Sequence, residues 1–288
     1  MKSLPSDLMI EQLEMAKMTL PKGVENEVQT LEHCVVHQVS IRDEEGAKAL
    51  GREMGRYVTI ETDKSYQIGE PAFEEIASAL ADQVKRMLKN RKKILVLGIG
   101  NPNITPDSLG SKAVELLMVT RPLKDRPKQY ASVSAMAASV YGVSGIESAE
   151  LAQGLVHSIA PEAVILIDAM ATARLERLCQ TIQLSDSGLT PGGGVDNARK
   201  EISEKTLGVP VLSVGMPTVV DCRVLLWHVL GKDWEKFGVK LHPFEESLIA
   251  TPRQMELATD MGARLIAFAI NKALHGDIST EEILKNLY

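Results

Sequence analysis

The sequence contains few cysteines and no paired cysteine motif. Its three cysteines, Cys34, Cys179 and Cys222, lie far apart in a chain of 288 residues. Because a disulfide framework or a zinc ribbon needs cysteines at matched spacings, the sequence indicates neither. This cysteine usage is typical of a reducing cytoplasm.

The sequence also lacks an excess of basic residues and any membrane-crossing segment near its start. The formal net charge is -6, whereas domains that bind nucleic acid usually carry a basic stripe that neutralises phosphates. Residues 1–18 include acidic side chains within their apolar periodicity, so they resemble neither a signal peptide nor a membrane span. We therefore expect no direct contact with nucleic acid or membrane.

The common motifs of nucleotide, metal and acyl chemistry are absent. The glycine turn GIGNPN has Asn103 where a dinucleotide fingerprint needs its third glycine, and no P-loop lysine follows. The six histidines form no zinc signature, and there is no GxSxG elbow. No cofactor or bound metal is expected, and carboxylates remain as the candidate catalytic groups.

Strands and helices alternate along the chain, which predicts an α/β fold. Strands are expected at residues 35–41, 57–62, 93–100, 130–136, 163–170, 181–186 and 209–217. Helices are expected at residues 44–51, 73–87, from 108 onward, and at 147–160, 219–238 and 251–276. The first two strands and the helix between them form an expected β-α-β unit. We predict one domain over residues 1–288, with helices on both faces of a mostly parallel sheet in three α/β/α layers.

Two aspartates follow or interrupt apolar strands. Asp107 lies beyond the strand at 93–100, where it is either the N-cap of the next helix or a ligand-binding group at a strand end. Asp168 interrupts the apolar stretch AVILIDAM, where an ionised carboxylate is costly without a partner. Its partner is either an arginine, Arg174 or Arg177, or a substrate.

A glycine-rich stretch, SDSGLTPGGGVDN, covers residues 185–197. It has the composition of a flexible loop. Its three consecutive glycines, Gly192, Gly193 and Gly194, would also let the backbone approach a peptide and donate N–H groups to an oxyanion.

Long ordered blocks of the sequence resemble the germination protease family of endospore-forming bacteria. They include GIGNPNITPDSLG, LIDAMATARLERLCQTIQLSDSGLTPGGGVDNARK and LGVPVLSVGMPTVVD, and the likeness extends over nearly the whole chain. Asp107 and Asp168 match the two essential aspartates of that family of atypical aspartic peptidases. One departure is Pro102, which stands between the two asparagines where the family commonly has tryptophan.

The resemblance implies an endopeptidase that begins the degradation of small acid-soluble spore proteins in the cytoplasm of the germinating spore, the spore core. It implies a fold related to hydrogenase-maturation endopeptidases and a homo-oligomer, a tetramer in the family. It also implies synthesis as a zymogen trimmed at the N-terminus. A second departure is that only a handful of residues precede SDL, so residues 1–20 are expected to hold a short or residual prosegment rather than one of typical length.

A two-aspartate mechanism follows as a hypothesis. Asp107, near a helix N-terminus, should favour the ionised form and act as base, whereas Asp168, among apolar residues, should stay protonated and act as acid. Asn101, Asn103 and the backbone of Gly192 to Gly194 are candidate substrate-binding groups. Two alternatives stay open: a metal-dependent maturation-type peptidase, and a noncatalytic spore protein that binds a peptide in the same cleft.

Overall fold

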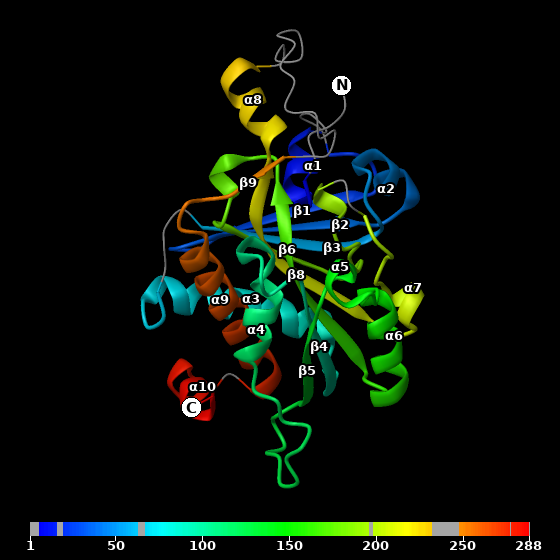
Figure 1. The fold of residues 1–288 in the computed structure, drawn as a ribbon, viewed down its shortest axis with the longest axis vertical. Coiled ribbons are helices and arrows are strands. Elements are labelled where there is room, and N and C mark those ends of the chain that lie inside the picture. Colours follow the sequence, from blue (N-terminus) through cyan, green and yellow to red (C-terminus); the bar gives the residue numbers. More distant parts are fainter. Residues whose placement is uncertain are drawn as a thin grey trace.

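A nine-stranded sheet with helices on both faces runs through the molecule (Figure 1). The computed structural model describes residues 6–15, 20–62, 67–195, 198–231, 248–276 and 278–287. The strands are β1 (Val24–Thr30), β2 (Val35–Ile41), β3 (Gly55–Glu61), β4 (Lys93–Ile99), β5 (Ser132–Ala138), β6 (Ala163–Thr172), β7 (Thr181–Ser185), β8 (Val211–Asp221) and β9 (Ile249–Ala250). The helices are α1 (Met9–Met15), α2 (Glu44–Leu50), α3 (Pro71–Leu88), α4 (Leu109–Glu115), α5 (Tyr141–Ser144), α6 (Ser148–Ile159), α7 (Glu204–Leu207), α8 (Cys222–Leu230), α9 (Met255–His275) and α10 (Thr280–Leu287). The 3-10 turns are η1 (Thr105–Asp107), η2 (Leu175–Arg177) and η3 (Gly193–Val195).

The sheet combines a parallel half and an antiparallel half. Its strand order is β1-β2-β3-β7-β8-β6-β4-β5, with β9 beside β8. Strands β5, β4, β6 and β8 pair in parallel, whereas β1, β2, β3 and β7 pair antiparallel, as do β7 and β8. The predicted α/β class is confirmed, and the predicted parallel pairing holds for the β5-β4-β6-β8 half.

The opening unit is an antiparallel meander rather than a β-α-β crossover. Strands β2 and β3 pair antiparallel, with Ile41 opposite Gly55. A helix of seven residues such as α2 spans only about 10 Å, which is too short to return the chain along a strand of roughly 23 Å. Strand β1 was not predicted, because its sequence VENEVQT is exposed along most of its length and has no apolar alternation.

The helix predicted over residues 219–238 is shorter than expected in the described part of the chain. Residues 219–221 continue the buried strand β8, and Asp221 caps α8 by accepting a hydrogen bond from the Arg223 backbone N–H at 2.8 Å. Residues 232–238 lie outside the described residues. Among the described helices, none has the length and apolar composition needed to cross a membrane.

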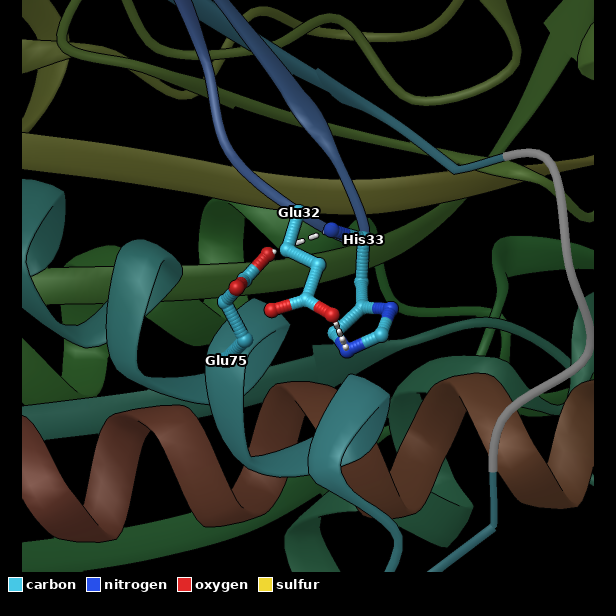
Figure 2. A group of neighbouring side chains, drawn as sticks. All are labelled: Glu32, His33 and Glu75. Carbon is cyan, nitrogen blue, oxygen red and sulfur yellow. Dashed lines mark hydrogen bonds and ion pairs between the residues drawn. The ribbon is translucent and has the colours of Figure 1, made fainter.

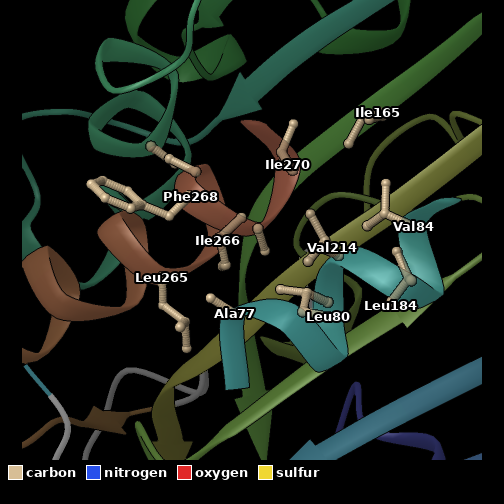
Figure 3. Close-up of a cluster of buried hydrophobic side chains, with 14 of the residues drawn as sticks. Ala77, Leu80, Val84, Ile165, Leu184, Val214, Leu265, Ile266, Phe268 and Ile270 are labelled. Carbon is tan, nitrogen blue, oxygen red and sulfur yellow. The ribbon is translucent and has the colours of Figure 1, made fainter. Parts of the chain in front are cut away.

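The largest apolar core lies between the sheet and helices α3, α4 and α9. Figure 3 shows side chains of α3 and α9 together with Ile165, Leu184 and Val214 of the strands that they cover. Phe73 and Phe268 meet edge to face with ring centroids 5.5 Å apart. This layer holds the parallel strands in place from one side.

The opposite face of the sheet carries a second core and the functional region. Along β6 the side chains alternate: Ile165 and Ile167 belong to the core under α9, whereas Val164 and Leu166 pack on the side of α6. Asp168 is the next residue on that second face, because strand side chains repeat every two residues. The alternation therefore turns Asp168 away from α3, α4 and α9.

Two glycines bring helix α4 into direct contact with the sheet. A Cβ atom at Gly98 of β4 would lie 2.0 Å from the Gly110 carbonyl oxygen, and one at Gly110 would lie 2.3 Å from the Ile99 oxygen and 2.5 Å from the Ile167 oxygen. No larger residue fits at this backbone contact. The start of α4, and with it η1, is thereby held over the carboxyl ends of β4 and β6.

The contact predicts that Gly110→Ala destabilises the fold. The methyl group would meet backbone atoms that cannot turn aside, so we expect a loss of about 1–3 kcal/mol and a fall in melting temperature of about 2–4 °C per kcal/mol. Differential scanning calorimetry measures this effect. Gly154→Ala in α6 is the control, because a Cβ there meets nothing within 4 Å; equal melting temperatures for the two variants would contradict the packing argument.

Candidate active site

A cleft of about 1450 Å³ opens at the carboxyl ends of β4 and β6. Asp107, Asp168 and Gly192 to Gly194 all line it. This edge of an open α/β sheet is where ligands ordinarily bind. The fold therefore brings together the two aspartates and the three glycines that the sequence identified.

Asp168 is the most buried acidic group of this cleft. It is 9% exposed, and its Oδ1 accepts a hydrogen bond from the Ala169 backbone N–H at 2.9 Å. Burial, followed by the nearby charges of Asp107 and Asp7, raises its pKa well above the usual value of 3.8. The protonated form of Asp168 is therefore favoured.

Neither Arg174 nor Arg177, the two arginines that the sequence offered as partners, forms a salt bridge with Asp168. Arg177 makes ion pairs with Glu11, Glu14 and Glu61, and Arg174 lies 3.5 Å from Glu14. The carboxyl of Asp168 thus lies beside other acids rather than beside these cations.

Asp107 lies in η1, and its carboxylate folds back onto the loop after β4. Its Oδ2 accepts a hydrogen bond from the Asn101 backbone N–H at 2.7 Å. It is not the N-cap of α4, since Ser108 holds that position. Burial raises the pKa of Asp107, and the Asn101 N–H partly offsets the rise. The expected stabilisation of the ionised form thus comes from a loop N–H, and it does not lower the pKa below the usual value.

A third carboxylate, Asp7, lies in the same cleft and was not identified from the sequence. Its backbone N–H donates to the Ala171 carbonyl at 2.9 Å, and its Oδ2 accepts from the Ala171 N–H at 2.8 Å. Burial raises its pKa, whereas the Ala171 N–H acts in the opposite direction. The segment Ser6–Leu8 therefore occupies part of the cleft next to Asp168.

The glycines Gly192 to Gly194 line the cleft, whereas the two predicted substrate-binding asparagines do not. Asn101 and Asn103 do not line the cleft; the side-chain oxygen of Asn101 accepts from the Asn103 N–H at 3.0 Å within the loop. Asn101 instead acts on the site through its backbone N–H. Gly194 lies against Asp7, since a Cβ at Gly194 would come within 2.0 Å of the Asp7 carboxylate. The Gly193 N–H donates to the Thr190 carbonyl and is not open to a substrate.

A group with metal-ligating side chains lies elsewhere. Within the described residues, Glu32, His33 and Glu75 offer ligand atoms within 4.8 Å of one another (Figure 2). They lie where the β1–β2 turn meets α3, and Glu75 accepts a hydrogen bond from the His33 N–H at 2.7 Å. None of the three lines the cleft, and neither Asp107 nor Asp168 belongs to the group.

A family model and the curated relatives of this chain name the same family. A family model described as germination protease matches residues 6–238. The germination protease of Caldanaerobacter subterraneus subsp. tengcongensis is 35% identical to this chain, over 98% of this chain and 98% of the relative. The germination protease of Clostridium perfringens is 34% identical, over 100% of both chains. The germination protease of Bacillus licheniformis is 39% identical over 74% of this chain and 61% of its own. Among solved structures, the NiFe hydrogenase maturation protease HycI from Thermococcus kodakarensis matches with a TM-score of 0.38 and 16% identity, covering 65% of this chain and 98% of that one.

The raised pKa of Asp168 predicts that Asp168→Asn stabilises the protein near neutral pH. An unfolded aspartate ionises near pH 3.8, whereas ionisation in the folded cleft is disfavoured. The resulting penalty is absent below pH 3.8, grows as the pH rises towards the folded pKa, and is complete above it. Removing it should raise the melting temperature by about 2–4 °C per kcal/mol.

Calorimetry at pH 5 and pH 7 tests this sign. The gain in melting temperature from Asp168→Asn should be larger at pH 7 than at pH 5. Asp82→Asn, at an exposed position of α3, is the matched control. A gain that is equal at both pH values, or larger at pH 5, would show that folded Asp168 does not hold its proton above pH 5, and would contradict a pKa well above 3.8.

Proposed function

Because this chain belongs to the germination protease family and is therefore a peptidase, we propose that it is an endopeptidase that begins the degradation of small acid-soluble spore proteins in the core of a germinating spore. The observation that carries the proposal is the presence of Asp107 and Asp168 in one cleft, where burial raises the pKa of both and the charge of Asp107 acts on Asp168. Paired carboxylates in different surroundings can divide acid and base roles between them. This pairing favours catalysis over a noncatalytic role.

The proposed reaction is hydrolysis of a peptide bond by general acid and base catalysis. The ionised carboxylate of Asp107 takes a proton from water, and the water oxygen bonds to the carbonyl carbon while Asp168 donates its proton to the carbonyl oxygen. The tetrahedral intermediate then breaks its C–N bond, the proton held by Asp107 passes to the leaving nitrogen, and a hydroxyl proton of the intermediate returns to Asp168. The stronger rise in the pKa of Asp168 supports this division of roles, although the pair titrates as a unit.

The position of Ser6–Leu8 supports a further part of the proposal, synthesis as a zymogen. Asp7 pairs with Ala171 through both its backbone N–H and its carboxylate, so a substrate cannot reach the same part of the cleft while the segment stays. Removal or displacement of the N-terminal segment would open it. Assembly into a homo-tetramer remains a prediction.

The charge of the chain fits substrates that have left their DNA. A net charge of -6 repels the phosphate backbone and attracts basic protein surfaces. The protease would therefore act on spore proteins that are free in solution.

The proposal predicts that each aspartate is needed for cleavage. Asp107→Asn and Asp168→Asn keep the size of the side chain but remove its proton chemistry, so each should lower kcat by about 100- to 10 000-fold. The assay incubates the purified chain, after its N-terminal segment has been removed or displaced, with a small acid-soluble spore protein and follows fragment masses. Asp82→Asn should leave the rate unchanged.

The same assay separates the remaining alternatives. A carboxylate dyad keeps its activity in the presence of a chelator, whereas a metal-dependent peptidase loses it and regains it when a divalent metal is restored. Normal rates in both single variants would rule out the dyad. Binding of the spore protein without any cleavage, by a chain whose N-terminal segment has been displaced, would favour a noncatalytic role.

A further inference from the structure

Gln183 lies on the floor of the cleft at the same level of the sheet as Asp168. Gln183 of β7 and Asp168 of β6 are both paired with Gly215 of the intervening strand β8. Directly paired residues project to the same face of a sheet, and two strand spacings place their Cα atoms about 10 Å apart. Gly215 has no side chain of its own, and the Met170 side chain of β6 covers it, since a Cβ at Gly215 would lie 2.8 Å from the Met170 Cε. Gln183, Met170 and Asp168 all line the cleft.

Both polar atoms of the Gln183 side chain bind peptide backbone. Its Nε2 donates to the Asp7 carbonyl oxygen at 2.8 Å, and its Oε1 accepts from the Met9 backbone N–H at 2.6 Å. The side chain is 4% exposed, so these bonds are made away from water. Neither bond involves a side chain of the bound segment, and the amide therefore binds any residue at this place.

The segment that Gln183 binds lies along the cleft in the manner of an added peptide. Asp7 exchanges two hydrogen bonds with Ala171 of β6, one through its backbone N–H and one through its carboxylate. Gln183 holds the same segment from the opposite side, at the carbonyl of the peptide bond between Asp7 and Leu8. A substrate that replaced the segment would meet the same two polar atoms.

We propose that Gln183 is a substrate-binding residue, whose amide donates to a carbonyl of the substrate peptide and accepts from the N–H two residues further along. The proposal rests on the proposed function, since it assumes that peptides are cleaved in this cleft. It assigns to Gln183 the recognition of the backbone and leaves the choice of side chains to other parts of the cleft.

A purely structural role for Gln183 makes the opposite prediction. Met9 begins α1, and the first N–H groups of a helix lack partners within the helix, so Gln183 could serve only to anchor α1. In that case, removal of the amide would loosen Ser6–Leu8 and open the cleft. Cleavage of an added substrate would then stay equal or become faster.

The experiment compares Gln183→Met with Gln180→Met in the full chain. Methionine keeps the length of the side chain and loses both hydrogen bonds, and Gln180 lies just before β7 and does not line the cleft. With a small acid-soluble spore protein as substrate, Gln183→Met should lower kcat/KM at least tenfold, whereas Gln180→Met should leave it unchanged. Gln183→Asn, with an amide one methylene shorter, should also lose activity, and circular dichroism checks that each variant is folded.

A binding measurement separates this proposal from the proposed function. In chains made inactive by Asp168→Asn, the added change Gln183→Met should weaken the Kd for the spore protein at least tenfold, as measured by calorimetric titration. Unchanged or raised kcat/KM with unchanged Kd overturns the role of Gln183 and leaves the peptidase proposal standing. Loss of affinity in the double variant, together with no cleavage by the unmodified chain, supports Gln183 and contradicts the peptidase proposal. Absence of binding in the Asp168→Asn chain as well as in the double variant overturns the role of Gln183.

Discussion

The backbone contact between Gly98 and Gly110 sets the geometry on which the cleft depends. With any side chain at either position, α4 would have to move away from β4 and β6. The turn η1 leads directly into α4, so the same movement would carry Asp107 away from Asp168. A pair of residues with no chemistry of their own thus determines how closely two acids lie.

The close approach of the acidic side chains in the cleft is unfavourable, so the surrounding structure has to hold them in place. Asp168 has lost most of its contact with water and faces the charges of Asp107 and Asp7. The apolar layer under α3 and α9 fixes the strand that carries Asp168 from the other face. If Asp168 is the proposed acid, the site gives up local stability for reactivity, because the ionised form is disfavoured at the group that has to hold the proton.

A buried ion-pair network holds the N-terminal segment against this site. Glu11 has a fully buried side chain that pairs with Arg177 and accepts from the Thr172 hydroxyl at 2.6 Å and the Ala173 N–H at 2.7 Å. Arg177 continues to Glu61, whose pKa is lowered to about 2 by His37 and Arg177. Because a buried charge without its partner is costly, α1 is held beside the end of β6. Ser6–Leu8 precedes α1 and lies in the cleft, where Asp7 bonds to Ala171 and Gln183.

The sequence predicted the parts of this arrangement that depend on local pattern. An acid within AVILIDAM indicates both a buried strand and an unusual carboxyl, and the glycine turn before Asp107 indicates the end of another strand. Gln183 and Asp7 depend on contacts between residues 164 to 176 positions apart, which no local pattern contains. A glutamine within the buried strand TIQLS is the same kind of signal as Asp168, but its partner is backbone, which has no sequence signature.

Asp7 links the access of other molecules to the cleft with the protonation of Asp168. Its negative charge is one of the causes that raise the pKa of Asp168, and the segment that carries it also excludes water. If the segment left the cleft, as proposed for a zymogen, that charge would be removed and water would enter, and both changes would lower the pKa of Asp168 towards its usual value. In the proposed mechanism, a substrate peptide that took the place of the segment would exclude water again, and the protonated form of Asp168 would then be favoured when a peptide bond is present to receive the proton. On this proposal, the occupant of the cleft would control both the access of a substrate and the acid strength of Asp168.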